Sequence, residues 1–271
     1  MRLDPSDFDP GLDHLAVTLS GGVATVTLSD PERRNAMGTH MTAAWGRFVQ
    51  AVAADVRVRV IVVRGAGTAF SSGGDTNWIG AAADLGEPAV QARMHEYYLS
   101  WLAIRTVPQP VIAAINGPAV GAAAALALAC DLRWASDAAM MSFPFVHLGI
   151  HAGMGSTWLL RQVVGTSVAA DLLLSGRPVS GAELRELGLV SHTIASAEFE
   201  LKVEQQAAAL AAAAPLAVAS LVATLRTPAA ATLAQALAAE AAAQAATFAS
   251  DDVREALAAR REGRPAVFQG R

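Results

Sequence analysis

Short apolar runs alternate with longer amphipathic segments through residues 1–195. Residues 15–28, LAVTLSGGVATVTL, alternate apolar with small or polar residues on both sides of Gly21–Gly22, which is typical of a β-hairpin with a primed turn. Residues 35–55 have helical spacing, and the β-branched runs that begin at Val58 and Val111 indicate buried parallel strands. Strands that alternate with helices in this order predict βαβ units and an α/β fold.

The chain becomes helical and rich in alanine from about Ala195 onward. In residues 233–248, LAQALAAEAAAQAATF, larger apolar residues recur at helical spacing, so we expect packed helices rather than a disordered tail. One face of these helices is available as an interface between copies of the chain. We therefore divide the sequence into a core of residues 1–195 and a C-terminal α-helical oligomerisation region of residues 196–271.

The stretch from Pro110 to Cys130 contains no charged side chain. A membrane span, a buried strand with a helix, and one wall of an active site are all compatible with that pattern. However, Asn116, Gly117–Pro118 and Gly121 interrupt the stretch, which leaves apolar pieces far shorter than the roughly 20 residues that a membrane helix needs. We expect a buried strand, a turn, and a core helix that begins after Gly121.

Composition narrows the class of protein. Hydrophobic residues make up 53% of the chain, much of it as alanine, and the net charge is −4. No Lys/Arg cluster alternates with aromatic residues, so nucleic-acid binding is not expected. The single cysteine, Cys130, excludes an intramolecular disulfide, and the acidic first ten residues do not resemble a secretory signal. We expect a globular, soluble, cytoplasmic protein with no membrane association.

Two glycine turns are candidates for chemistry. Gly73–Gly74 and Gly121 each follow a predicted strand and precede a predicted helix. Backbone N–H groups at a helix start lack intrahelical acceptors and carry partial positive charge, which suits an oxyanion. Taken alone, either turn is more often a simple connection between a strand and a helix, and Asp75 is more often the cap of the helix that follows.

Dinucleotide binding and serine-peptidase chemistry are not expected, because the motif of each is incomplete. Residues 65–70, GAGTAF, follow a strand, but Phe70 takes the third glycine position of a dinucleotide fingerprint, and no acidic residue ends a clear second strand. Ser71 and Ser72 precede the glycines without a matching His and Asp for serine-peptidase chemistry on the related Clp protease fold.

Six segments in order resemble the crotonase (enoyl-CoA hydratase/isomerase) superfamily: VTLSDPERRNAM, IVVRGAGTAFSSGGD, PVIAAINGPAVGAAAALALACDLRWA, FPFVHLGIHAGMGSTWLLRQVVG, GRPVSGAELRELGLV and TFASDDVREALAARREGRPAVF. The resemblance implies a crotonase-like ββα superhelix core with a C-terminal helical trimerisation region, assembled as a homotrimer or a dimer of trimers. It also implies an acyl-CoA thioester substrate, with coenzyme A entering as part of the substrate and no separate cofactor or metal.

The resemblance carries specific site residues with it. It implies that the thioester oxygen is held by the backbone N–H groups of Gly74 and Ala122. It further implies substrate contacts at the matching positions Arg34, Ala36, Gly73, Asp75, Gly121, Ala125, Phe145 and Gly153. Arg33, Arg34, Arg261 and Arg264 are candidate contacts for CoA phosphates, although each is also explained as a surface charge.

The sequence departs from the family where hydratases carry two proton-handling glutamates. The matching positions hold Ala125 and Phe145, and neither side chain can transfer a proton. Losing one general acid or base usually costs about 10² to 10⁴ in rate, so ordinary hydratase activity is doubtful. The alternatives are a non-catalytic acyl-CoA-binding or regulatory subunit, or another crotonase chemistry such as decarboxylation or thioester hydrolysis.

His147 and His151 are the titratable side chains nearest to the missing second glutamate. Their spacing resembles a metal pair, but Leu148 stands where a zincin has Glu, Gly149 weakens the helix, and no third ligand is evident. Each is a candidate acid or base, His151 the better placed because it precedes the Gly153 turn, and each is also explained as a structural histidine.

Residues 94–101, MHEYYLSW, lie in the segment after Asp75. Their titratable and aromatic side chains are candidates for a pocket lid, namely His95, Glu96, Tyr97 and Tyr98. A solvated helix face explains the same residues, and we expect that simpler arrangement.

Overall fold

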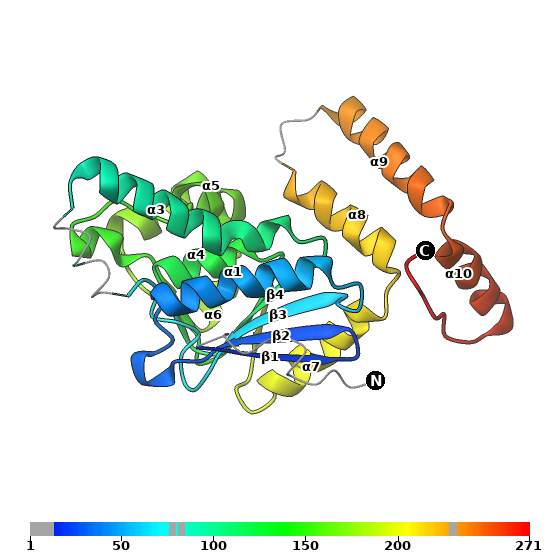
Figure 1. Ribbon diagram of the computed structural model, residues 1–271, viewed down its shortest axis with the longest axis horizontal. Coiled ribbons are helices and arrows are strands. Elements are labelled where there is room, and N and C mark those ends of the chain that lie inside the picture. Colours follow the sequence, from blue (N-terminus) through cyan, green and yellow to red (C-terminus); the bar gives the residue numbers. More distant parts are fainter. Residues whose placement is uncertain (1–13, 76–79, 81–84, 228–231) are drawn as a thin grey trace.

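The computed structural model describes residues 14–271 except 76–79, 81–84 and 228–231, and it is an α/β structure with an extended helical C-terminal part (Figure 1). The strands are β1 Leu15–Ser20, β2 Val23–Leu28, β3 Val60–Gly65, β4 Val111–Ile115, β5 Pro118–Val120, β6 Leu132–Ser136, β7 Met140–Ser142, β8 Val179–Ser180 and β9 His192–Ile194. The helices are α1 Thr39–Ala54, α3 Glu87–Leu102, α4 Ala122–Ala129, α5 Ser156–Ser175, α6 Ala182–Glu186, α7 Phe199–Ala211, α8 Pro215–Arg226, α9 Leu233–Phe248 and α10 Asp251–Glu262. Short 3₁₀ turns lie at η2 Pro31–Arg33, η3 Ala103–Thr106 and η4 Pro144–Leu148.

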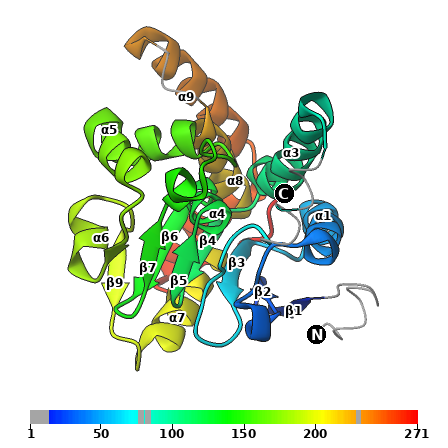
Figure 2. The ribbon, with the colours of Figure 1, turned by 90° about the vertical axis from the view of Figure 1, so that its left-hand side faces the viewer.

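The main sheet has the strand order β1-β2-β3-β4-β6-β9. Strands β1 and β2 form the expected antiparallel hairpin, in which Gly21 and Gly22 both have positive φ, and every later pair in this sheet is parallel. A second sheet has the order β5-β7-β8 and lies beside the first, with α4 close to both (Figure 2). The expected alternation of strands and helices is confirmed.

Side-chain alternation on β3 divides the core into two layers. Ile61 and Val63 face the larger cluster beneath α1, α3 and α4, whereas Val60 and Val62 face the opposite side. On that opposite side α7 covers the sheet with Phe199, Val203, Ala207 and Ala211. Burial on both faces is why these strands read as continuous β-branched runs rather than alternating ones.

The apolar stretch at 110–130 folds as a buried strand and a core helix, with one element that the pattern did not predict. All of β4 and all of α4 are buried. Between them the chain forms β5, whose first residue is Pro118, a position where a missing N–H does not break the ladder. Three residues are too few to show a strand period, so the sequence predicted only a turn here.

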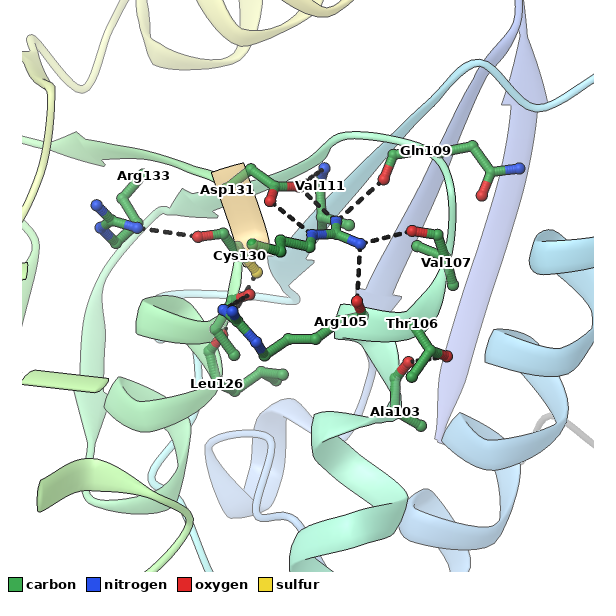
Figure 3. A network of polar contacts seen from close by, with 12 residues as sticks. Ala103, Arg105, Thr106, Val107, Gln109, Val111, Leu126, Cys130, Asp131 and Arg133 are labelled. Carbon is green, nitrogen blue, oxygen red and sulfur yellow. Dashed lines mark hydrogen bonds and ion pairs between the residues drawn. The ribbon is translucent and has the colours of Figure 1, made fainter. Parts of the chain in front are cut away.

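Helix α8 is fixed to the core through one arginine. The Arg226 guanidinium binds both carboxylate oxygens of Asp131, with Nε–Oδ1 at 2.8 Å and Nη2–Oδ2 at 2.6 Å. It also donates to the carbonyl oxygens of Arg105, Val107 and Gln109. Asp131 accepts a further bond from the N–H of Val111 at 2.8 Å. Figure 3 shows that these carbonyl oxygens and the Asp131 carboxylate surround a single guanidinium group.

The helices beyond α8 project away from the sheets (Figure 1). No residue of α9 is buried in the single chain. Large apolar side chains remain exposed along α8 and α9, namely Leu216, Leu221, Leu225, Leu233, Leu237 and Phe248. Among the described helices none alone has the length and apolar content of a membrane span, and α7 and α8 reach that content only together, across a 106° bend.

The side chain of Arg226 is 11% exposed and that of Asp131 is 16% exposed. Removing the guanidinium therefore leaves the Asp131 carboxylate without its partner and largely shielded from water. We expect Arg226→Ala to lower the free energy of unfolding by about 3 to 5 kcal/mol. Urea unfolding at fixed protein concentration measures this change. The matched control is Arg254→Ala, which removes a pair whose side chains are 73% and 63% exposed. Its effect should stay within about 0.5 kcal/mol, and equal losses in the two variants would contradict the role given to Arg226.

Candidate active site

The loop that carries Gly73 and Gly74 is held by a buried asparagine, Asn35. The Asn35 amide donates to the carbonyls of Ala66 and Ala69, at 2.9 Å each, and its Oδ1 accepts the N–H of Asp30. Its backbone carbonyl accepts the hydroxyl of Ser71 at 2.7 Å. Asn35 has a φ of 56°, a left-handed conformation that asparagine tolerates better than most residues. This role of Asn35 was not predicted from the sequence. The only indication was its position in the segment RRNAM, which is part of the family resemblance.

Ser71 passes this support on to the glycines. Its Oγ accepts the N–H of Gly73 at 3.0 Å, and the carbonyl of Gly73 accepts the N–H of Met37 at 2.8 Å. The N–H and carbonyl of Ser71 also pair with the β5 segment, through Pro118 and Val120. In the described residues the hydroxyl and backbone of Ser71 are therefore engaged in positioning this loop.

The two glycine turns are in contact. Gly73 has a φ of 84°, and a Cβ atom there would overlap the carbonyl oxygen of Val120 and lie 3.2 Å from the nitrogen of Ala122. Only glycine allows this approach. Gly121, with φ 55° and ψ −111°, redirects the chain so that α4 begins at Ala122, and its own N–H donates to Ser142. Two turns that are far apart in sequence thus meet at the start of α4.

Neither the Gly74 N–H nor the Ala122 N–H has a hydrogen-bond acceptor among the residues that the structure describes. Ala122 is the first residue of α4, and an N–H at that position has no intrahelical acceptor. The aligned peptide dipoles of α4 add partial positive charge at the same end. The arrangement can therefore bind an oxygen that carries negative charge.

Ala125 and Phe145 are apolar residues close to the start of α4. Ala125 is fully buried on the first turn of α4, where its N–H donates to Gly121 at 3.0 Å. The Phe145 ring is 9% exposed, and its Cζ lies 3.7 Å from where a Cβ on Gly121 would be. Neither position offers a proton donor or acceptor in its side chain.

Asp75 and Arg33 form an ion pair next to the first turn. The hydrogen bond to Asp75 and its charge raise the pKa of Arg33. The Asp75 carboxylate therefore has a partner other than the expected helix cap, and residues 76–79, where that helix was expected to begin, lie outside the described residues. Arg34 is exposed, with its carbonyl accepting the N–H of Ser72, and Ala36 is half-buried behind it.

His147 and His151 are both exposed, and their rings contact segments other than the two glycine turns. The His147 ring lies against Gly176 at the end of α5, with Nε2 2.8 Å from where a Cβ on Gly176 would be. The Nδ1 of His151 is 2.8 Å from the carbonyl oxygen of Ala152. Within the described residues no group of three His, Cys, Asp or Glu side chains is arranged to hold a metal.

Helix α3 carries two adjacent tyrosines that pack against the core. Tyr97 is buried, donates its hydroxyl to the carbonyl of Met37 at 3.1 Å, and has a pKa raised mainly by desolvation. Tyr98 is half-buried and lies against Gly153, where a Cβ would overlap its hydroxyl. The expectation of a solvated face is therefore wrong for the tyrosines and holds for His95 and Glu96, which are exposed.

Comparisons with known proteins give the family. The enoyl-CoA hydratase/isomerase family model matches residues 18–271. The YngF protein of Bacillus subtilis (strain 168), assigned to the enoyl-CoA hydratases/isomerases, is 34% identical over 249 residues, which cover 92% of this chain and 95% of that protein. A probable enoyl-CoA hydratase of the same strain is 31% identical over 263 residues, covering 96% of this chain and all of that one.

A solved structure of an enoyl-CoA hydratase from Polaromonas sp. JS666 is 32% identical and superposes with a TM-score of 0.87 over 94% of this chain and 99% of that one. The enoyl-CoA hydratase from Bacillus anthracis is 27% identical, with a TM-score of 0.89 over 95% of this chain and all of that one. The expected crotonase-like fold with a helical C-terminal region is thereby confirmed. The chain belongs to the enoyl-CoA hydratase/isomerase family, within the crotonase superfamily.

Proposed function

We propose that this enzyme binds an acyl-CoA thioester and stabilises negative charge on the thioester oxygen with the N–H groups of Gly74 and Ala122. The contact between Gly73 and the Val120–Ala122 turn carries this proposal, because it brings two N–H groups without acceptors in the described residues to one place. Coenzyme A enters as part of the substrate, and the proposed chemistry needs no further cofactor. A cytoplasmic location, where a free cysteine such as Cys130 stays reduced, belongs to the same proposal.

The residues around the two donors favour some reactions over others. Two fixed donors stabilise an enolate or a tetrahedral oxyanion as it forms. Hydration also needs a proton at the α-carbon and an activated water, and the apolar pair Ala125 and Phe145 supplies neither. Some reactions form the oxyanion without glutamates at these two positions, for example the decarboxylation of a carboxyacyl thioester. In such reactions the two N–H donors would still stabilise the charge that develops. A subunit that binds acyl-CoA without turnover is the second candidate, and the same pair of residues supports it.

We expect crotonyl-CoA hydration to be slower by about 10² to 10⁴ or more than in a family member with both glutamates, because each lost acid or base costs that order of rate. The decrease in crotonyl-CoA absorbance, followed with the purified protein, measures this. Adding back carboxylates in the double variant Ala125→Glu, Phe145→Glu is the companion experiment. Turnover by the unmodified chain at the rate of a glutamate-bearing enzyme would rule out the assignment of these two positions.

A second prediction concerns the donors themselves. Gly74→Val places a β-branched side chain where the thioester must approach the backbone, so the carbonyl should no longer reach both N–H groups. Removing one such donor costs roughly 2.7 to 4 kcal/mol of transition-state stabilisation. Any turnover found should fall at least about a hundredfold, with the circular-dichroism spectrum unchanged.

The control is Gly46→Val on α1, where an added Cβ meets no atom within 4 Å. For a binding subunit, Gly74→Val should weaken acyl-CoA binding with no turnover to lose. Unchanged binding together with unchanged turnover in Gly74→Val would eliminate the proposed site.

We also propose that the chain assembles as a homotrimer or a dimer of trimers through its C-terminal helices. The support is the exposed apolar row on α8 and α9, where Leu225 is 79% and Leu233 is 76% exposed in the single chain. Such a row is costly in water and typical of an interface. Sedimentation equilibrium at micromolar concentration should give three or six times the monomer mass, and a monomer alone would contradict the assembly.

A further inference from the structure

The segment that leads into α1 lies against the loop that carries Gly74. Met37 donates its N–H to the carbonyl of Gly73 at 2.8 Å and pairs with Gly74 as a parallel β-bridge. In a parallel pairing a residue bonds to the neighbours of its partner rather than to the partner itself, so the N–H of Gly74 is directed away from Met37. Gly38 lies equally close to the loop, since a Cβ there would be 3.1 Å from Oδ2 of Asp75. The position of Met37 and Gly38 therefore determines where the Gly74 donor lies.

Two side chains of α3 hold this segment in turn. The hydroxyl of Tyr97 donates to the carbonyl of Met37 at 3.1 Å, in a buried contact between residues 60 positions apart. The indole N–H of Trp101 donates to Oγ1 of Thr42 at 2.9 Å, and the Thr42 hydroxyl donates to the carbonyl of Gly38 at 2.8 Å. Helix α3 thus reaches both residues of the segment through hydrogen bonds.

Helix α3 is itself fixed to α1 by a pair of buried indoles. The rings of Trp45 and Trp101 are stacked with their centroids 4.9 Å apart, and the indole N–H of Trp45 donates to the carbonyl of Trp101 at 3.1 Å. Tyr97 is buried one turn before Trp101, where desolvation raises the pKa of the phenol, so the hydroxyl stays protonated and donates. Water does not compete for a hydrogen bond in such a place. The Tyr97 hydroxyl therefore restrains the carbonyl of Met37 in addition to packing its ring in the core.

We propose that Tyr97 is a positioning residue for the thioester: its hydroxyl fixes the carbonyl of Met37 and, through this residue, aims the Gly74 N–H at the thioester oxygen. This inference rests on the acyl-CoA site proposed above. Tyr97 acts through the backbone of Met37 and does not itself touch the substrate. Its effect on the site is expected to be large for so remote a group, because a misplacement of about 1 Å costs on the order of 10² in rate.

The test follows the thioester carbonyl by infrared difference spectroscopy on the full chain, with butyryl-CoA isotopically labelled at that carbonyl. Hydrogen bonds to the oxygen weaken the C=O bond, so the band of the bound ester should lie at a lower wavenumber than that of the free ester. Tyr97→Phe removes only the hydroxyl and should abolish roughly half of this downshift, because it displaces one of two donors. Isothermal titration calorimetry gives the ester concentration that saturates each variant.

The matched control is Tyr98→Phe, the same chemical change at the next residue, whose hydroxyl lies at the Gly153 turn rather than at Met37. It should keep the downshift of the wild type. Thr42→Val provides an independent variant, because it replaces the hydroxyl that links Trp101 to Gly38 by a methyl group of similar size. It should reduce the downshift in the same direction as Tyr97→Phe, and it carries the test if Tyr97→Phe does not fold.

The outcomes separate this inference from the function beneath it. A lower melting temperature with an unchanged carbonyl band in Tyr97→Phe would show a role in packing alone, and equal changes of the band in Tyr97→Phe and Tyr98→Phe would show no specific path through Met37. Either result overturns the inference and leaves the acyl-CoA site intact. If the wild type binds butyryl-CoA without a downshift, or does not bind it, the proposed site itself is refuted and the role of Tyr97 with it.

Discussion

The site depends on one steric constraint, the backbone contact between Gly73 and the Val120–Ala122 turn. No side chain fits between these two segments, and the approach is maintained by hydrogen bonds that run from Asn35 through Ser71 to the N–H of Gly73. Because those bonds are buried and each donor has its acceptor, the geometry does not rely on a bound ligand. In the proposed site the N–H groups of Gly74 and Ala122 are therefore held in place before any substrate arrives, which is the condition for efficient charge stabilisation.

The described residues nearest to these donors bring little net negative charge to the start of α4. Ala125 and Phe145 have apolar side chains, and the nearby Asp75 carboxylate is paired with Arg33. An oxyanion formed at the turn of Gly121 would meet the positive end of α4 without a competing carboxylate beside it. In the proposed site, the apolar side chains of Ala125 and Phe145 thus bring no negative charge to the start of α4.

Local sequence patterns were sufficient to predict most of the helices and strands. They were not sufficient to predict which distant residues contact each other. The hairpin at Gly21–Gly22, the buried strand β4 and the uncharged helix α4 each have a period or turn signature that depends only on neighbouring residues. Strand β5 is too short to have one. The burial of Tyr97 depends on α1 packing against α3, and the partner of Asp75 lies 42 residues away, so neither could be inferred from spacing.

Family resemblance contributed what local patterns could not. It paired Gly74 with Ala122 before any contact was known, and the structure brings their turns together. It did not identify Asn35 as the residue that fixes the loop, nor Tyr98 as a polar group beside Gly153. Both depend on atoms that meet only in the folded chain.

The Arg226 anchor also joins regions that the sequence separates. Its guanidinium binds Asp131, and the same carboxylate accepts the N–H of Val111 at the start of β4, the strand that leads into Gly121. Helix α8 and the strand behind the site are thus members of one hydrogen-bonded frame rather than modules joined by a hinge. Because Arg226 and Val111 share the carboxylate of Asp131, a displacement of α8 would change the hydrogen bonding at the start of β4.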